Sequence, residues 1–166
     1  MKTLLLLRHA KSSWDASNVT DHDRPLNDRG KRDAPRMGRL IKQNDLTPDL
    51  ILVSTAKRAR KTATTVAQHC GDEVELKKKH KLYEAPSAAF VSILREVPDH
   101  RQRVLIVAHN PGIEQFLEDL TGRFETMPTA ALAQITLGID SWRDIQPCGM
   151  SKLAGVWRPR GLETVG

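Results

Sequence analysis

Short apolar runs alternate along the chain with longer stretches in which apolar residues recur every three or four positions. The short runs have the length of β-strands, and the longer stretches have the period of amphipathic helices. Such alternation is typical of βα units packed around a largely parallel sheet. We therefore expect an α/β fold, a three-layer α/β/α sandwich with a central, mostly parallel sheet.

Six strands and four helices are predicted. The expected strands cover residues 3–7, 49–53, 74–76, 104–108, 131–137 and 152–156, with the last two at the sheet edges. The expected helices run from Asn27 or Asp28 to about Gln43, from Lys57 to His69, from Pro86 or Ser87 onward, and from Asn110-Pro111 to Thr121-Gly122. Pro35 removes a backbone hydrogen bond inside the first helix and predicts a kink there or a later start near Asp33.

A chain of 166 residues is long enough for one well-buried domain. We expect a single domain over residues 1–158, with a loop at 140–147 and a frayed tail at 159–166. The longest apolar run, Leu4 to Leu7, is too short to span a membrane and is not followed by a cleavage site. Cys70 and Cys148 have no CxxC spacing, so we expect neither disulfides nor a zinc site, and a cytoplasmic location.

The formal charge of +6 favours anionic partners without choosing among them. A basic run at residues 77–81, Lys-Lys-Lys-His-Lys, could bind nucleic acid, but a solvated strand end is the simpler interpretation. The few aromatic residues, three Phe, three Trp and one Tyr, leave little for base stacking. We expect no nucleic-acid and no membrane partner.

Candidate chemistry follows three of the predicted strands. Arg8-His9, the segment Ser54 to Arg58, and His109-Asn110 each come directly after an apolar run. The carboxyl edge of a parallel sheet is where α/β proteins bind ligands. Two arginines and two histidines meeting there, beside helix starts, would bind a dianion such as a phosphoryl group.

These residues resemble the histidine phosphatase superfamily, which has the phosphoglycerate mutase-like fold and an Arg-His pair ending its first strand. Position 10 is alanine, where the family usually has glycine, and in this feature the chain resembles the short branch typified by the phosphohistidine phosphatase SixA. The resemblance extends over residues 3–157. Its further motifs are Lys11-Ser12-Ser13-Trp14, Asp23-Arg24-Pro25-Leu26 with Arg29-Gly30, Ser54 to Arg58 with Thr62-Ala63, Leu82-Tyr83-Glu84, Val107 to Pro111, and Pro128-Thr129-Ala130.

The resemblance implies that His9 is the nucleophile and that Arg8, Arg58 and His109 hold the phosphoryl oxygens. Neutral imidazole forms a labile phosphoramidate, and arginine donors match the oxygens of a phosphoryl group in transfer. Glu84 is a candidate proton donor, or alternatively a residue that interacts with the dipole of the helix after it.

Two further residues are candidate phosphate ligands. Arg24 could instead line the mouth of the site or pair with Asp21 or Asp23, and Ser54 could instead cap its helix. The Asp21-x-Asp23 pair does not indicate an aspartate-based phosphatase, because no apolar strand precedes it. The six histidines lack metal-ligand spacing, so we expect no metal or other cofactor.

The sequence therefore predicts a metal-independent phosphatase with a phosphohistidine intermediate on His9. Following the resemblance, the expected substrate is phosphohistidine in a phosphorelay or phosphotransferase protein. Alternatives are small phosphomonoesters, or a noncatalytic module that binds phosphoproteins. No P-loop, HExxH or GxSxG motif is present, and neither cysteine is followed six residues later by the arginine that cysteine-based phosphatases need.

Overall fold

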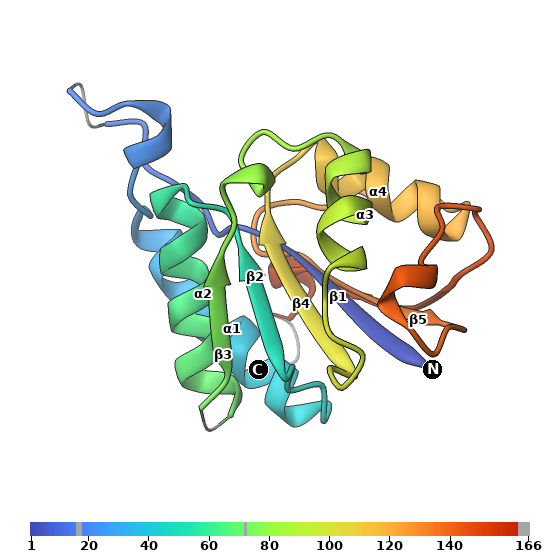
Figure 1. Ribbon diagram of the computed structural model, residues 1–166. Coiled ribbons are helices and arrows are strands. Elements are labelled where there is room, and N and C mark those ends of the chain that lie inside the picture. Colours follow the sequence, from blue (N-terminus) through green and yellow to red (C-terminus); the bar gives the residue numbers. More distant parts are fainter. Residues whose placement is uncertain (16–17, 72, 163–166) are drawn as a thin grey trace.

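The computed structural model describes residues 1–15, 18–71 and 73–162, and these form three layers (Figure 1). The strands are β1 (Lys2–Arg8), β2 (Leu50–Val53), β3 (Glu75–Lys78), β4 (Arg103–Ala108), β5 (Leu132–Leu137) and β6 (Lys152–Trp157). The helices are α1 (Asp28–Gln43), α2 (Lys57–Cys70), α3 (Ser87–Arg95), α4 (Gly112–Thr121) and α5 (Pro159–Leu162). Short 3-10 helices cover Asp21–Asp23, His80–Leu82 and Trp142–Asp144.

The strands form one sheet in the order β3-β2-β4-β1-β5-β6. Strands β3, β2, β4 and β1 pair in parallel, whereas β5 is antiparallel to both β1 and β6. The predicted mostly parallel α/β sheet is thus confirmed. The prediction that β5 is an edge strand was wrong: its apolar side chains, such as Leu132 and Ile135, are fully buried, and β3 is the second edge. Lys77 and Lys78 are exposed on that edge, as predicted for a solvated strand end.

Helices cover both faces of the sheet, with α1 and α2 on one side and α3 and α4 on the other (Figure 1). Successive residues of a strand point to opposite faces. Leu5 and Leu7 accordingly pack in the cluster with α1 and α2, while Leu4 and Leu6 pack with α3 and α4. This double burial explains why β1 is a continuous apolar run.

Helix α1 starts at Asp28, with Pro35 inside it, so the later start near Asp33 is not adopted. The Asn27 side chain caps the helix by accepting a hydrogen bond of 2.9 Å from the Gly30 N–H. A Cβ on Gly30 would lie 2.2 Å from the carbonyl oxygen of Lys11. Glycine therefore allows α1 to pack directly against the loop that follows β1.

Other segments also differ from the expectations. The predicted loop at 140–147 contains the 3-10 helix at Trp142–Asp144, because the indole of Trp142 is buried and donates a 2.7 Å hydrogen bond to the Arg101 carbonyl. Helix α4 begins one residue after Pro111. Residues 159–162, expected in a frayed tail, form α5, whose Pro159 is buried, while 163–166 lie outside the described residues. No helix in the described ranges is long and apolar enough to cross a membrane.

Candidate active site

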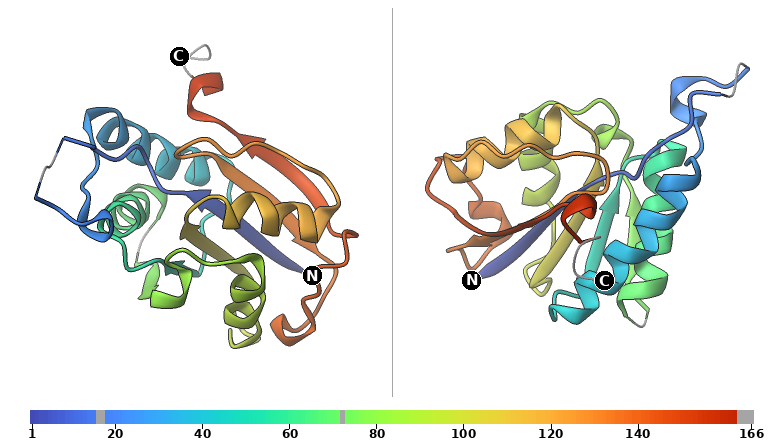
Figure 2. Two further views of the ribbon diagram at one scale, coloured as in Figure 1. Left: turned by 90° about the horizontal axis from the view of Figure 1, so that it is seen from above. Right: turned by 180° about the vertical axis from the view of Figure 1, so that it is seen from behind.

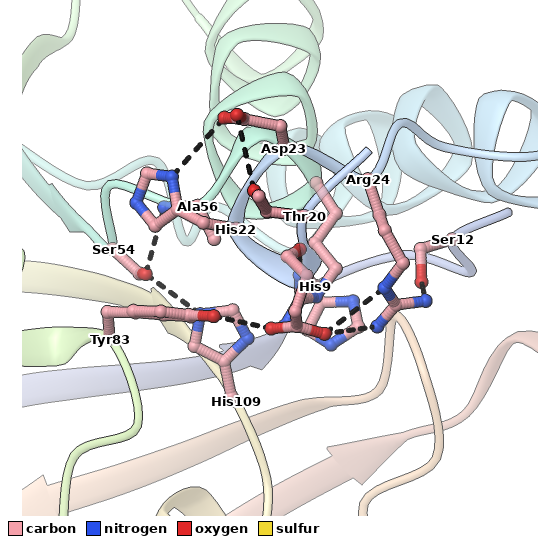
Figure 3. Close-up of polar contacts among 12 residues, drawn as sticks. His9, Ser12, Thr20, His22, Asp23, Arg24, Ser54, Ala56, Tyr83 and His109 are labelled. Atoms are coloured by element: carbon pink, nitrogen blue, oxygen red, sulfur yellow. Dashed lines mark hydrogen bonds and ion pairs between the residues drawn. The ribbon is translucent and has the colours of Figure 1, made fainter. Parts of the chain in front are cut away.

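The three strand ends singled out in the sequence lie together. Arg8 ends β1, Ser54 follows β2 and His109 follows β4, and these parallel strands are neighbours in the sheet. The backbone N–H of His9 donates to the Ala108 carbonyl at 3.0 Å. The ring centroids of His9 and His109 are 5.0 Å apart. The predicted convergence at the carboxyl edge of the sheet is therefore confirmed (Figure 3).

The imidazole of His9 is buried and uncharged at neutral pH. Only 6% of the residue is exposed, and burial is the main reason that its pKa falls to about 3. The neighbouring His109, Arg58 and Arg8 lower this pKa further. Its Nδ1 lies 2.8 Å from the Ala10 carbonyl, which can only accept, so Nδ1 carries the proton. The lone pair is consequently on Nε2, as a nucleophile requires.

Ser54 orients the second imidazole, that of His109. The Ser54 Oγ lies 2.8 Å from Nε2 of His109 and accepts a 3.2 Å hydrogen bond from the Ala56 N–H. The other ring nitrogen of His109, Nδ1, is buried, has no hydrogen-bond partner among the described residues, and faces His9 (Figure 3). Burial, reinforced by Arg58, lowers the pKa of His109 to about 4. Ser54 is not the helix cap considered above, since the N-cap position of α2 is Ala56.

Arg58, in the first turn of α2, contacts a carboxylate that the sequence had not marked as part of the site. Its Nη1 donates to the Asp21 carbonyl at 2.6 Å and its Nη2 to Asp21 Oδ2 at 3.2 Å. Its buried Nε has no hydrogen-bond partner in the part of the chain that the structure describes. The Tyr83 hydroxyl also donates to Asp21 Oδ2, at 2.5 Å. That bond, followed by the charge of Arg58, lowers the pKa of Asp21 to about 2. Asp21 is therefore an ionised carboxylate held over the site.

Arg8 is fixed by a network that reaches it from α4. Its Nη1 donates to the Met127 carbonyl at 3.2 Å, and its buried Nε has no partner within the described ranges. Asn110 donates to both Glu114 Oε1 and the Met127 carbonyl, and the Met127 N–H donates to the same Glu114 oxygen. Burial lowers the pKa of Arg8, and the carboxylate of Glu114 opposes that shift. Sequence reasoning missed Glu114, whose only signal was its place four residues after Asn110.

Arg24 joins the same network of side chains through Asp21 (Figure 3). Its Nε donates to Asp21 Oδ1 at 3.1 Å and its Nη1 to Ser12 Oγ at 2.7 Å. Its guanidinium lies over the exposed Trp14 ring, 3.6 Å from the centroid. Of the two partners considered for Arg24, the structure selects Asp21.

Glu84 is exposed and lines a pocket of about 450 Å³ that His109 and Asn110 also line. Helix α3 begins only at Ser87, so Glu84 is not in its first turn. The carboxylate is thus on the open side of the candidate site.

Beside it, an aromatic rim surrounds Tyr83. The Tyr83 ring lies 5.6 Å from that of His109 and 4.8 Å from that of His22. His22 and His80 both contact the Thr55 hydroxyl, at 2.9 Å and 3.1 Å. No group of three or more His, Cys, Asp or Glu in the described part of the chain is placed to hold a metal ion.

Comparison with known proteins gives one consistent result. Residues 4–86 match the model of the histidine phosphatase superfamily (branch 1). Rv1276c of Mycobacterium tuberculosis is 31% identical over 165 residues, which cover 93% of this chain and all of that protein. A SixA structure from Agrobacterium tumefaciens has a TM-score of 0.81 and 30% identity, covering 95% of this chain and 98% of its own.

A second solved structure, the protein histidine phosphatase SixA complexed with tungstate, shares the fold. Its TM-score is also 0.81, at 21% identity, with coverage of 96% of this chain and 99% of that one. Together with the Arg8-His9 pair at the end of β1, these similarities identify the phosphoglycerate mutase-like fold. The chain belongs to the histidine phosphatase superfamily.

Proposed function

We propose that this protein is a phosphatase that transfers a phosphoryl group to Nε2 of His9 and then to water. Its superfamily and its likeness to SixA support a phosphatase activity. The observation that carries the proposal is a buried, neutral His9 beside three side chains with unpaired buried nitrogens. Those nitrogens are Nε of Arg8, Nε of Arg58 and Nδ1 of His109.

The proposed reaction has two steps. The Nε2 lone pair of His9 attacks phosphorus, so that an N–P bond forms while the bond to the leaving group breaks and its electron pair departs with the leaving atom. Water then attacks the same phosphorus, the N–P bond breaks, and the imidazole becomes neutral again. A low pKa suits both steps, because the imidazole is free to attack and is a good leaving group.

Arg8, Arg58 and His109 would hold the phosphoryl oxygens during both steps. Guanidinium groups remain charged when buried, and each offers several hydrogen-bond donors to the equatorial oxygens of the phosphoryl group in transfer. A buried polar nitrogen without a partner is costly, and an oxyanion would satisfy all three at once. This positive charge supplies the stabilisation that a metal ion gives in other phosphatases, so we propose a metal-independent reaction. Activity should persist in excess EDTA.

We propose phosphohistidine in a partner protein as the substrate, because SixA, which shares this fold, is a protein histidine phosphatase. Imidazole needs little help from an acid to leave. Small phosphomonoesters are the second candidate. They are favoured by Glu84, whose carboxylate lines the pocket beside His109 and could protonate an alkoxide.

The test compares kcat/KM for a phosphohistidine protein with that for p-nitrophenyl phosphate. The proposal predicts turnover of both, with a clear preference for the protein. Turnover of the small ester alone would contradict the protein substrate and favour the second candidate. Binding of the phosphoprotein without turnover of either substrate would contradict the enzyme proposal and favour a noncatalytic binding module.

A further inference from the structure

A pocket of about 430 Å³ lies next to the candidate active site and is lined by cations from distant parts of the chain. We call it the basic pocket. Its five cationic residues are Arg8, Lys11, Arg29, Arg158 and Arg160, with Pro128, Thr129 and Pro159 completing its wall. Arg160 is brought there because α5 lies against α1 (Figure 2).

Among residues 1–15, 18–71 and 73–162, no acidic side chain lines the basic pocket. Two of its cations are partly neutralised by carboxylates that do not line the pocket: Arg29 is 3.5 Å from Asp33, and Arg158 is 3.0 Å from Glu125. Within the ranges that the structure describes, neither Lys11 nor Arg160 has an ion-pair partner. Several like charges around one space repel each other, and an oxyanion placed there would relieve that repulsion.

Arg8 joins the basic pocket to the site around His9. It lines the pocket, and its charge also acts on the pKa of His9. The backbone N–H of Ala130, next to the pocket residue Thr129, donates to the carbonyls of both Arg8 and His9. An anion in the pocket would therefore lie beside a phosphoryl group held at His9.

We propose that the basic pocket binds a second anionic group of the phosphorylated substrate, a phosphate or a carboxylate. This inference rests on the proposed function for its substrate, although the pocket itself can be tested without turnover. Arginine binds both oxyanions through paired hydrogen bonds. A substrate carrying two acidic groups would thus contact Arg8 from both sides, one group at His9 and the other toward Lys11 and Arg160.

The first experiment measures, by calorimetry, the binding of phosphate and of tripolyphosphate, which carries three phosphate units in one chain. The test variant is Lys11→Gln/Arg160→Gln, and the control, Lys61→Gln/Lys152→Gln, loses the same charge at exposed positions outside the pocket. We expect the test variant to bind tripolyphosphate about 10-fold more weakly or worse, since charge-assisted contacts are lost. The control variant should bind both anions within about 2-fold of wild type.

Equal affinity of wild type and test variant for tripolyphosphate would overturn the proposal, as would an equal loss in the control. Because this measurement involves no catalysis, its failure is distinct from a failure of the proposed phosphatase activity. If the wild type bound tripolyphosphate in this way but showed no turnover, only the proposed phosphatase activity would be refuted.

The second experiment identifies the source of the anion through kcat/KM. Phenyl phosphate is compared with 4-carboxyphenyl phosphate, and a phosphohistidine peptide flanked by alanines with one flanked by aspartates. A preference for the acidic aryl ester that Lys11→Gln/Arg160→Gln abolishes indicates a small diacidic substrate. The same result with the peptides indicates acidic residues beside the phosphohistidine of a partner protein. Absence of any preference in both pairs would overturn the proposal.

Discussion

Acid should destabilise the wild-type protein more than a His9→Gln variant, because the folded protein keeps this imidazole uncharged. Burial lowers the pKa of His9 to about 3, whereas histidine in an unfolded chain titrates at about 6.5. Between these values the unfolded state binds a proton that the folded state does not. The resulting stability is complete above the unfolded pKa and is lost as the pH falls toward the folded one. Glutamine does not titrate, so the variant lacks this loss.

The magnitude follows from the difference between the two pKa values. At pH 5 the solution is about 1.5 pH units below the pKa of histidine in the unfolded chain. Protonation therefore stabilises the unfolded state by about 2 kcal/mol relative to pH 7.5. Any folded-state pKa below about 4 gives the same figure, because the folded imidazole is then already neutral at pH 5. The difference between wild type and variant cancels the contributions of the other titrating groups.

Urea unfolding followed by circular dichroism at the two pH values measures this effect. The free energy of unfolding of the wild type should fall by about 2 kcal/mol more than that of His9→Gln. His100→Gln, which removes an exposed imidazole, is the matched control. If wild type and His9→Gln lost the same free energy, the imidazole would not be held neutral in the fold, and the reasoning about the nucleophile would be refuted.

Three further changes test the surroundings of His9. Ser54→Ala leaves Nε2 of His109 unpaired, so urea unfolding should show a loss of about 1–3 kcal/mol together with a lower kcat, and an unchanged kcat would contradict a positioning role. Glu84→Gln should lower kcat/KM for butyl phosphate by about 10²–10⁴ but leave a phosphohistidine peptide within about 2-fold, whereas equal losses on both would exclude Glu84 as the acid. Asp21→Asn removes the carboxylate that occupies Arg58, so inhibition by phosphate should strengthen about 2- to 5-fold, and weaker inhibition would show that Asp21 is needed to place Arg58.

The framework of the site could be predicted because it depends on short-range patterns. A fully buried run such as Leu4 to Leu7 marks a central parallel strand, and whatever follows such strands must lie at one edge of the sheet. That rule alone predicts that Arg8-His9 and His109 lie close together. The position of β5 could not be predicted by this rule, because an edge strand and the strand next to it can both appear in the sequence as a short apolar run.

The parts that could not be predicted depend on contacts between segments with no common pattern. Asp21 reaches Arg58 from 37 positions away, and a carboxylate is not the charge expected over a phosphate site. Ser54 has the position of a helix cap, and only the neighbouring strand β4 shows that it binds His109 instead. The basic pocket needs Arg160, which lies in a segment whose sequence suggests a frayed tail.

Trapping the phosphoenzyme tests the central claim most directly. Wild type and His9→Ala are mixed with radiolabelled substrate, quenched in alkali and digested, and the labelled peptide is identified. The account predicts label on His9 in a linkage that survives alkali and is lost in acid, and no label in the variant, whose circular dichroism matches that of wild type. Label on another residue, or label that persists in the folded variant, would contradict it.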